Sequence, residues 1–451
     1  MRSTEATGHR TAGPARGQAE ADRYPVEDDV PEVGALPGPG AGEPSFPDAD
    51  LPFPVDVHDL PAVDADVPGA VGRVLAQVLG DRVGRARATD EVFARDIAER
   101  VARFTLDGGK RVRSRFVWWG MRACGGTDAA SAEAALRIGA ALELIQTCAL
   151  VHDDVMDGAR LRRGRPALHT DITAQYAGSV PGAGGVRLGE AAAILAGDLA
   201  LAWADDLVTD TVLAPGTARR VRGVWRAMRT EMVAGQYLDV QGEATSAHRT
   251  ARALRAACLK SALYSVERPL GLGAALAGAD AATTRALASA GRCAGLAFQL
   301  RDDLLDVFAE PRRTGKPSGG DIRSGKPTYL VALARARAEA AGDRRSLVVL
   351  RRSLGRPDLS EAQLARVREV LVTTGARRIV EARIDRLAAR ALRHLAAADL
   401  DPGPRRRLRG LLCSVAGVPD GRGGLPAPPA GTGPPGRSVL LTAAGAEGWS
   451  R

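Results

Sequence analysis

The pattern of apolar and polar positions between residues 68 and 418 predicts a succession of amphipathic helices. In the segment AALRIGAALELIQTCALVHDD, Ile138, Leu142, Ile145 and Ala149 recur at steps of three and four residues, as on one face of a helix. Similar patterns predict helices over about 90–105, 111–123, 188–211, 217–245, 250–277, 281–309, 328–341 and 374–398. Convincing strand alternation is lacking, and glycine-rich breaks separate the helices. The sequence therefore predicts one all-α domain, a large helical bundle over residues 68–418.

Both ends of the chain differ from this pattern and are expected to be disordered. Residues 1–67 contain ten prolines and few large apolar side chains. Residues 419–451 are rich in proline and glycine. An alternative for part of the first segment, SFPDADLPFPVDVHDLPAV, is a short docking segment, because apolar residues alternate there with prolines.

Charge is distributed unevenly along the chain. Residues 1–67 carry 4 Arg against 14 Asp and Glu, a balance of −10, so the net charge of +9 leaves +19 on the remainder. A basic body suits an anionic small substrate at least as well as nucleic acid, and no nucleic-acid partner is predicted.

The cysteines and the apolar runs indicate a cytoplasmic location. The five cysteines lie far apart without metal-binding spacing, which is typical of a reducing compartment. The N-terminal residues lack the apolar core of a signal peptide. The longest apolar run, EAAAILAGDLALAWADD, is interrupted by Asp198, so no transmembrane segment is predicted.

Two aspartate clusters, HDDVMD and RDDLLD, carry the most specific chemical signal. Asp153 and Asp157 are four residues apart and share a helix face, as do Asp302 and Asp306; Asp154 and Asp303 complete the clusters. Carboxylates that lie side by side repel each other, and a bound Mg²⁺ ion neutralises their charge. Mg²⁺ also keeps coordination positions for phosphate oxygens. A solvated acidic helix end is the alternative for one cluster. Two clusters, each after an apolar helix, favour a magnesium–diphosphate site.

Basic loops accompany both clusters. The segment GGKRVR precedes a predicted helix, so that its free N–H groups and cationic side chains suit an anion. RLRRGRP follows the first aspartate cluster, and TGKPSGGDIRSGKP follows the second. Each basic loop alone is typical of a solvated surface, but their placement after the acidic clusters suits a metal-bridged diphosphate.

These segments resemble the trans-isoprenyl diphosphate synthases, the polyprenyl synthetase family, and most of all its geranylgeranyl diphosphate synthases. GGKRVR, LIQTCALVHDDVMDGARLRRGRP, GQYLD, LKSALY, FQLRDDLLD and GKPSGGDIRSGKPT follow one another in the family's order. The resemblance implies an all-α fold around a central cavity, a homodimer and three Mg²⁺ ions. It implies a head-to-tail condensation of isopentenyl diphosphate with an allylic diphosphate that releases pyrophosphate.

The resemblance also implies residue roles. Asp153, Asp157 and Asp302 would ligate metal directly, and Asp154, Asp303 and Asp306 mostly through water. Isopentenyl diphosphate would contact Gly109, Lys110, Arg113, Gln146 and Arg163. The allylic diphosphate would contact Arg162, Lys260, Ser261, Gln299, Lys316 and Lys326. Lys260, Ser261 and Gln236 would face the transient cation, and Asp239 would orient Lys260. The family usually has Thr at the position of Ser261, and serine retains the hydroxyl group.

The four lysines of the chain, Lys110, Lys260, Lys316 and Lys326, all fall in these motifs, whereas the other 58 basic residues of the chain are arginines. A compact ammonium group and a planar guanidinium are not equivalent. We therefore expect exchange of Lys110, Lys260 or Lys316 for arginine to impair turnover although the charge is kept.

Product length is predicted from Cys148 and Ala149, which precede Asp153 by about one helical turn. In the family, bulky aromatic residues at this place stop growth at fifteen carbons, so small residues imply twenty or more, and geranylgeranyl diphosphate is the prediction. Trp118, Trp119 and Trp203 are candidates for a deeper floor, although ordinary core positions suit them better. The alternatives are a product of twenty-five or more carbons, a terpene cyclase, or a partner subunit docked to a protein shell.

Overall fold

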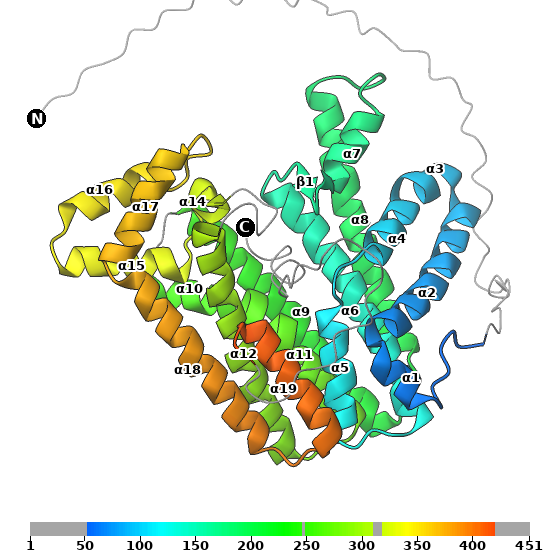
Figure 1. Ribbon diagram of the computed structural model, residues 1–451. Coiled ribbons are helices and arrows are strands. Elements are labelled where there is room, and N and C mark those ends of the chain that lie inside the picture. The colour runs from blue at the N-terminus through cyan, green and yellow to red at the C-terminus, as the bar shows by residue number, and fades with distance from the viewer. Residues whose placement is uncertain (1–51, 246–248, 310–317, 420–451) are drawn as a thin grey trace, which may run out of the picture. The chain divides into compact units, whose positions relative to one another are not determined.

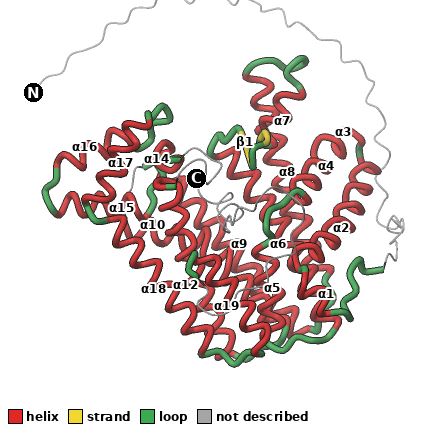
Figure 2. Tube along the Cα trace, in the orientation of Figure 1, coloured by secondary structure: helices red, strands yellow, loops and turns green. Residues whose placement is uncertain are grey.

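The computed structural model describes residues 52–245, 249–309 and 318–419. The chain divides into two units, Met1–Pro52 and Phe53–Arg451, and the helices described below belong to the second. This unit is built from helices, with one two-stranded hairpin among the residues described (Figure 1, Figure 2). The predicted all-α fold is confirmed.

The folded part begins before the predicted boundary at residue 67. Helix α1 (Leu60–Ala65) and helix α2 (Val67–Thr89) each start with an aspartate cap and a proline in the first turn. Asp59 accepts a hydrogen bond from the N–H of Ala62, and proline suits a first turn because its missing N–H would be unpaired there. Pro61 and Pro68 therefore mark helix starts. The remaining tail residues, 1–51 and 420–451, lie outside the described part of the chain, and these include the first seven residues, 45–51, of the alternative docking segment.

The first half of the bundle surrounds one long buried helix. α3 (Glu91–Phe93), η1 (Ala94–Ala98), α4 (Glu99–Leu106) and α5 (Val112–Ala123) lead to α6 (Ala129–Met156), followed by the hairpin β1 (Leu161–Arg162) and β2 (Arg165–Pro166), then α7 (Leu168–Gln175) and α8 (Ala183–Asp210). The hairpin strands are antiparallel, with Arg162 opposite Arg165. Helix α6 packs on α8, α5 and α2, and Figure 1 shows it in the interior of the bundle.

The second half supplies the other wall of the bundle. It contains α9 (Pro215–Ala244), α10 (Thr250–Ala257), η2 (Cys258–Glu267), α11 (Arg268–Leu276), α12 (Ala281–Phe308), α14 (Gly320–Ser324), α15 (Tyr329–Ala340), α16 (Arg344–Ser353), α17 (Glu361–Thr373), α18 (Ala376–Ala396) and α19 (Pro402–Ala416). Helix α12 packs against η2 on one side and α18 on another.

Two apolar clusters stabilise the bundle. The larger core takes side chains from α2, α5, α6, α8 and α11, and the smaller core takes them from α14, α15, α17 and α18. Helix α12 contributes to both, with Phe298 in the larger core and Leu300 and Leu304 in the smaller one. The two acidic segments are therefore held by different parts of the hydrophobic interior.

Helix α6 is long and apolar enough to cross a membrane by length and composition alone. However, 94% of its most apolar stretch is buried inside the bundle. Such burial is typical of a core helix whose apolar side chains are covered by neighbouring helices on all sides. Its apolar character is explained by packing.

Candidate active site

The first aspartate cluster lies at the C-terminal end of α6. Asp153 and Asp154 are buried, with 2% and 1% exposure, although the segment ends a helix. Asp157 caps the helix, and its backbone N–H donates to the carbonyl of Asp153. Burial and the adjacent carboxylate of Asp153 raise the pKa of Asp157 to about 7. The cluster is therefore a concentrated, poorly solvated negative charge.

The hairpin after α6 places the guanidinium of Arg162 beside this cluster, where its positive charge offsets the negative charge of the carboxylates. Nε of Arg162 donates to both carboxylate oxygens of Asp154, at 2.9 and 3.2 Å, and its Nη2 also contacts Asp154. The same Nη2 lies 3.9 Å from Oδ2 of Asp153. Burial still raises the pKa of Asp154 above its ordinary value, because the guanidinium compensates the lost hydration only in part.

The second aspartate cluster lies near the C-terminal end of α12. Asp302 and Asp303 are buried, and Oδ1 of Asp303 accepts a 2.8 Å hydrogen bond from Nε2 of Gln299. Burial raises the pKa of Asp303 to about 7, with Asp302 adding to the effect and Lys326 opposing it. Oδ2 of Asp306 accepts from the N–H of Asp321, which ties the cluster to the start of α14.

Two lysines connect the clusters. Nζ of Lys260 lies 2.8 Å from Oδ2 of Asp239 and 3.5 Å from Oδ1 of Asp153. Nζ of Lys326 lies 3.9 Å from the same oxygen of Asp239. The carboxylates of Asp321, Asp239, Asp303 and Asp153 together raise the pKa of Lys326, against the opposing effect of burial. The ends of α6 and α12 thus share one electrostatic environment.

A narrow cavity lies where these helices meet. Its lining includes side chains from α9, η2, α12 and the segment before α15, namely Asp239, Lys260, Ser261, Gln299, Asp303 and Lys326. The cavity therefore brings together Asp239, Lys260 and Ser261 of the predicted catalytic group with Gln299 and Lys326 of the predicted allylic group, whereas Gln236 and Arg162 lie outside its lining. Lys316, also predicted to bind the allylic diphosphate, lies outside the described residues.

An unusual helix geometry places Lys260 and Ser261. Residues Cys258–Glu267 form a π-helix, η2, between α10 and α11. A Cβ on Gly235 of α9 would lie 2.7 Å from Cα of Lys260, and one on Gly295 of α12 would lie 2.7 Å from Cα of Ala262. Glycine at these positions lets both helices approach the widened turns, which commonly mark functional sites.

Several buried polar atoms around the clusters have no hydrogen-bond partner among the described residues. They include Oδ2 of Asp153, Oδ2 of Asp157, Oγ of Ser261, Oε1 of Gln236 and Oε1 of Gln299. Nε2 of Gln236 does donate to Oδ1 of Asp153, at 2.8 Å. Buried polar atoms without partners are costly, and those of a binding site are satisfied by ligand, water or ion.

The donor set fits magnesium held together with a ligand. Hard carboxylate oxygens suit Mg²⁺, which takes one or two carboxylates and completes its shell with water and phosphate oxygens. Among the described residues, no group of three or more His, Cys, Asp or Glu is arranged to hold a metal alone.

The predicted isopentenyl diphosphate residues come from the start of α5, from α6 and from the hairpin. Arg113 is buried; its Nη2 donates to Oγ of Ser265 at 3.1 Å, and its guanidinium lies over the ring of Tyr264. Both amide atoms of the buried Gln146 lack hydrogen bonds to described residues. Gly109 and Lys110 lie in the loop before α5, which begins after Arg111 in a left-handed conformation. Nη1 of Arg163 donates to the carbonyl of Asp107 at 3.3 Å.

The predicted chain-length residues lie in the interior. Cys148 and Ala149 are buried on α6, and burial raises the pKa of the Cys148 thiol to about 12, so it behaves as a small apolar group. Trp118, Trp119 and Trp203 belong to the larger core. Nε1 of Trp118 donates to Asp64 of α1, which gives this residue a structural role.

Asp321 is a site residue that the sequence interpretation missed. It is buried, and neither carboxylate oxygen has a hydrogen bond from a described residue, although Oδ1 lies 3.8 Å from Nζ of Lys326. Burial raises its pKa well above the ordinary value. The available signal was a lone acid between two lysines in the loop GKPSGGDIRSGKP.

The chain is similar to known proteins over most of its described part. Residues 95–369 match the family described as polyprenyl synthetase. The chain is 34% identical over 283 residues to a farnesyl diphosphate synthase of Geobacillus stearothermophilus, covering 58% of this chain and 84% of that protein. It is 34% identical over 279 residues to a geranylfarnesyl diphosphate synthase of Aeropyrum pernix, covering 61% and 79%.

A similar solved structure is a geranylgeranyl pyrophosphate synthase of Corynebacterium glutamicum, complexed with isoprenyl diphosphate and magnesium. It is 36% identical, with a TM-score of 0.72, and the match covers 80% of this chain and 99% of that one.

Proposed function

Because the chain belongs to the polyprenyl synthetase family of trans-prenyl diphosphate synthases, and is thus a prenyltransferase, we propose that it makes geranylgeranyl diphosphate. The reaction is the magnesium-dependent, head-to-tail condensation of isopentenyl diphosphate with an allylic diphosphate, which releases pyrophosphate. The observation that carries the proposal is the convergence of both aspartate clusters on Lys260 and Lys326.

Asp153, Asp157 and Asp302 are the proposed direct magnesium ligands, and Asp154, Asp303 and Asp306 act through water. Three ions are proposed for each site. The carboxylate oxygens of Asp153 and Asp157 without hydrogen bonds support this role. Bound magnesium supplies positive charge that stabilises the departing pyrophosphate.

The residues of the chain itself bind and orient the allylic diphosphate. Lys260, held by Asp239, donates to the diphosphate, and Arg162, Gln299, Lys316 and Lys326 are its other proposed contacts. Breaking the allylic C–O bond leaves a carbocation and transfers the electron pair to pyrophosphate. The Oγ of Ser261 and Oε1 of Gln236, which are buried acceptors without hydrogen bonds to described residues, stabilise the cation as fixed dipoles.

Isopentenyl diphosphate is bound on the other side by Gly109, Lys110, Arg113, Gln146 and Arg163. The two unpaired amide atoms of Gln146 support this assignment, since a buried amide without partners is otherwise unfavourable. The double bond of isopentenyl diphosphate attacks the cation and forms the new C–C bond. The released pyrophosphate takes the final proton, so no histidine base is needed.

The proposed product of twenty carbons rests on Cys148 and Ala149, whose small buried side chains would not block a growing chain as aromatic rings would. A longer product, of twenty-five carbons or more, is the alternative that the same observation favours. The test is incubation of the purified chain with isopentenyl diphosphate, each of the C5, C10 and C15 allylic diphosphates, and MgCl₂, followed by chromatography of the dephosphorylated products. A linear C20 alcohol is expected. Cyclic hydrocarbons, or no elongation of any primer, would contradict the proposal.

A homodimer and a cytoplasmic location are also proposed. The dimer is supported by apolar side chains that α8 and α9 leave exposed, among them Ile194, Leu195, Val233, Tyr237 and Val240. Val233, Tyr237 and Val240 recur at four- and three-residue steps, so they share a face of α9. Exposed apolar side chains gathered on one helix face are typical of protein interfaces. Light scattering during gel filtration is expected to give twice the chain mass, and Val233→Glu with Tyr237→Glu is expected to halve it.

A further inference from the structure

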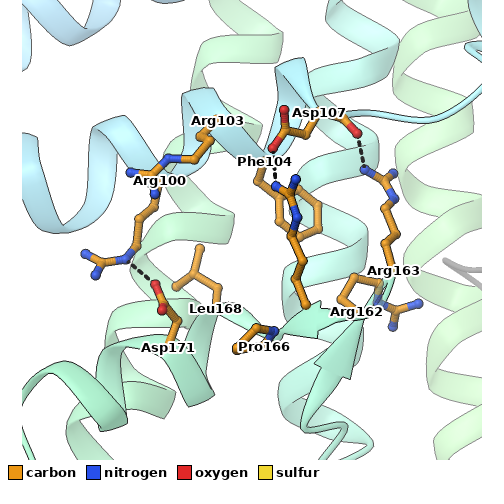
Figure 3. A pocket seen from close by; sticks show the side chains of 10 residues that line it. Arg100, Arg103, Phe104, Asp107, Arg162, Arg163, Pro166, Leu168 and Asp171 are labelled. Carbon is orange, nitrogen blue, oxygen red and sulfur yellow. Dashed lines mark hydrogen bonds and ion pairs between the residues drawn. The ribbon is translucent and has the colours of Figure 1, made fainter.

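A second pocket lies beside the proposed active site, between α4, the hairpin and the start of α7 (Figure 3). Its volume is about 400 Å³, within the range of small-molecule sites. The lining excludes Lys110, Arg113 and Gln146, and it shares only Arg162 and Arg163 with the proposed diphosphate contacts. The pocket therefore adjoins the proposed active site at Arg162 and Arg163 and is lined otherwise by different residues.

The lining of this pocket carries excess positive charge. Five arginines and two aspartates contribute to it. Asp171 pairs with Arg100 at 2.9 Å, and Asp107 pairs with Arg165 at 2.6 Å. The side chain of Arg103 is exposed, and its guanidinium forms no hydrogen bond or ion pair with another residue in the described part of the chain. Its guanidinium is therefore available to an anion.

The walls of the pocket are held in place by further contacts. Nη1 of Arg100 donates to the carbonyl of Asp96 at 2.8 Å, and its Nη2 contacts Gln175. Figure 3 shows Arg100 and Arg103 on the α4 side, with Pro166 and Arg162 on the hairpin side. The guanidinium of Arg163 lies over the ring of Phe104, 5.4 Å from its centre. Arginines fixed in this way are preorganised for the paired oxygens of phosphate groups.

The lining also has an apolar part, formed by Phe104, Pro166 and Leu168. A polyanion fits the arginines of this lining, and a short hydrocarbon group attached to it would fit the apolar part. Arg100, Arg162 and Arg165 are already paired with carboxylates, so Arg103 is the arginine that first meets the ligand. A lining with more arginines than aspartates favours a ligand with several negative charges over a single carboxylate.

We propose that this pocket binds the diphosphate group of a second, non-reacting ligand, either inorganic pyrophosphate or isopentenyl diphosphate. The inference rests on the proposed function only in the choice of these two probes. Arg162 links the pocket to the catalytic carboxylates, since the same guanidinium is hydrogen-bonded to Asp154.

The test is isothermal titration calorimetry of the full chain with inorganic pyrophosphate in EDTA. The Lys110→Ala background is used to weaken the proposed isopentenyl diphosphate site. We expect pyrophosphate still to bind, and Arg103→Glu in this background to weaken binding at least tenfold. The matched control is Arg219→Glu, an exposed arginine of α9 outside the pocket. Absence of binding in Lys110→Ala, or equal affinities of the Arg103→Glu and Arg219→Glu variants, would overturn the proposal.

The same titration with isopentenyl diphosphate separates the two sources of the diphosphate. A loss in Arg103→Glu with both probes shows that the pocket accepts the ester. A loss with pyrophosphate alone assigns it to the free anion, and no loss with either overturns the proposal. Product formation by the unaltered chain tests the proposed function separately, so failure of one experiment leaves the other interpretable.

Discussion

The ammonium group of Lys260 lies between two carboxylates that come from different helices, at 2.8 Å from Asp239 on α9 and 3.5 Å from Asp153 on α6. Lys260 is the third residue of the π-helix η2, and its exposure is 2%. Three elements thus meet at one nitrogen atom. A buried charge with two partners is held in a narrow range of positions.

Lys260→Arg is expected to reduce kcat by about 10²-fold, the scale seen when one electrostatic donor is lost from an active site. The guanidinium keeps the charge, but it is larger and planar and cannot occupy the same buried position. Steady-state kinetics with isopentenyl diphosphate and an allylic primer measures the effect. Lys110→Arg and Lys316→Arg are expected to impair turnover as well. Unchanged kinetics in all three folded variants would refute a specific need for lysine.

Magnesium binding is expected to strengthen as the pH rises from 6 to 8. The pKa values of Asp157 and Asp303 are about 7 without a cation, so protons compete with metal below that pH. These pKa values are raised on folding. Their stabilising contribution is therefore complete below the unfolded value near 4 and is lost as the pH rises through about 7.

In EDTA, the melting temperature of Asp303→Asn should therefore increase relative to that of the unaltered chain as the pH rises from 5 to 8. Thermal melts at both pH values measure this difference. Magnesium with pyrophosphate should stabilise the unaltered chain more at pH 8 than at pH 6. A pH-independent magnesium shift would contradict the assignment of these carboxylates.

Cys148→Phe is expected to shorten the product, because an aromatic ring in the buried turn before Asp153 fills the space that a growing chain needs. Ala149→Phe should act in the same direction. Cys148→Ala is the matched control and should keep the original product length. Chromatography of the dephosphorylated alcohols reports the change, and an identical product profile in both phenylalanine variants would place the end of the cavity elsewhere.

Gly235→Ala is expected to lower both stability and activity. The added methyl would lie 2.7 Å from Cα of Lys260, which forces α9 and η2 apart. Overpacking of this kind costs about 1–3 kcal/mol. Gly223→Ala on the same helix is the control, since its methyl would meet no atom within 4 Å, and it should stabilise by roughly 0.5–1 kcal/mol. Urea denaturation and kcat measure the two effects; equal behaviour of both variants would contradict the close approach.

The helical periodicity predicted the fold well where helices are long and regular. The pattern around Leu142 and Ile145 falls within α6, and the segment 374–398 corresponds to α18 (Ala376–Ala396). The segment 250–277 was predicted as one helix, but it divides into α10, η2 and α11. A π-helix changes which residues share a helix face, and no residue type in the sequence indicates where it occurs. Here the π-helix packs closely against Gly235 and Gly295.

The sequence also named most residues that meet at the site, because the carboxylates and lysines have a recognisable order. Burial of the carboxylates was not predictable in the same way. The sequence pattern presents Asp153 and Asp154 as the polar end of a helix. In the structure, Arg162 of the hairpin contacts Asp154, and Lys260 and Gln236 contact Asp153, so this helix end is buried. Asp321 was missed because one acid in a basic loop carries no periodic signal.

The division of the interior into two apolar cores has a consequence for inactivation by heat. The α6 carboxylates are anchored in the larger core, whereas Lys326 is flanked by Ile322 and Tyr329 of the smaller one. Loosening of the smaller core alone would therefore separate the two halves of the catalytic charge arrangement while most helices persist. Catalysis should then disappear several degrees below the temperature at which far-ultraviolet dichroism is lost.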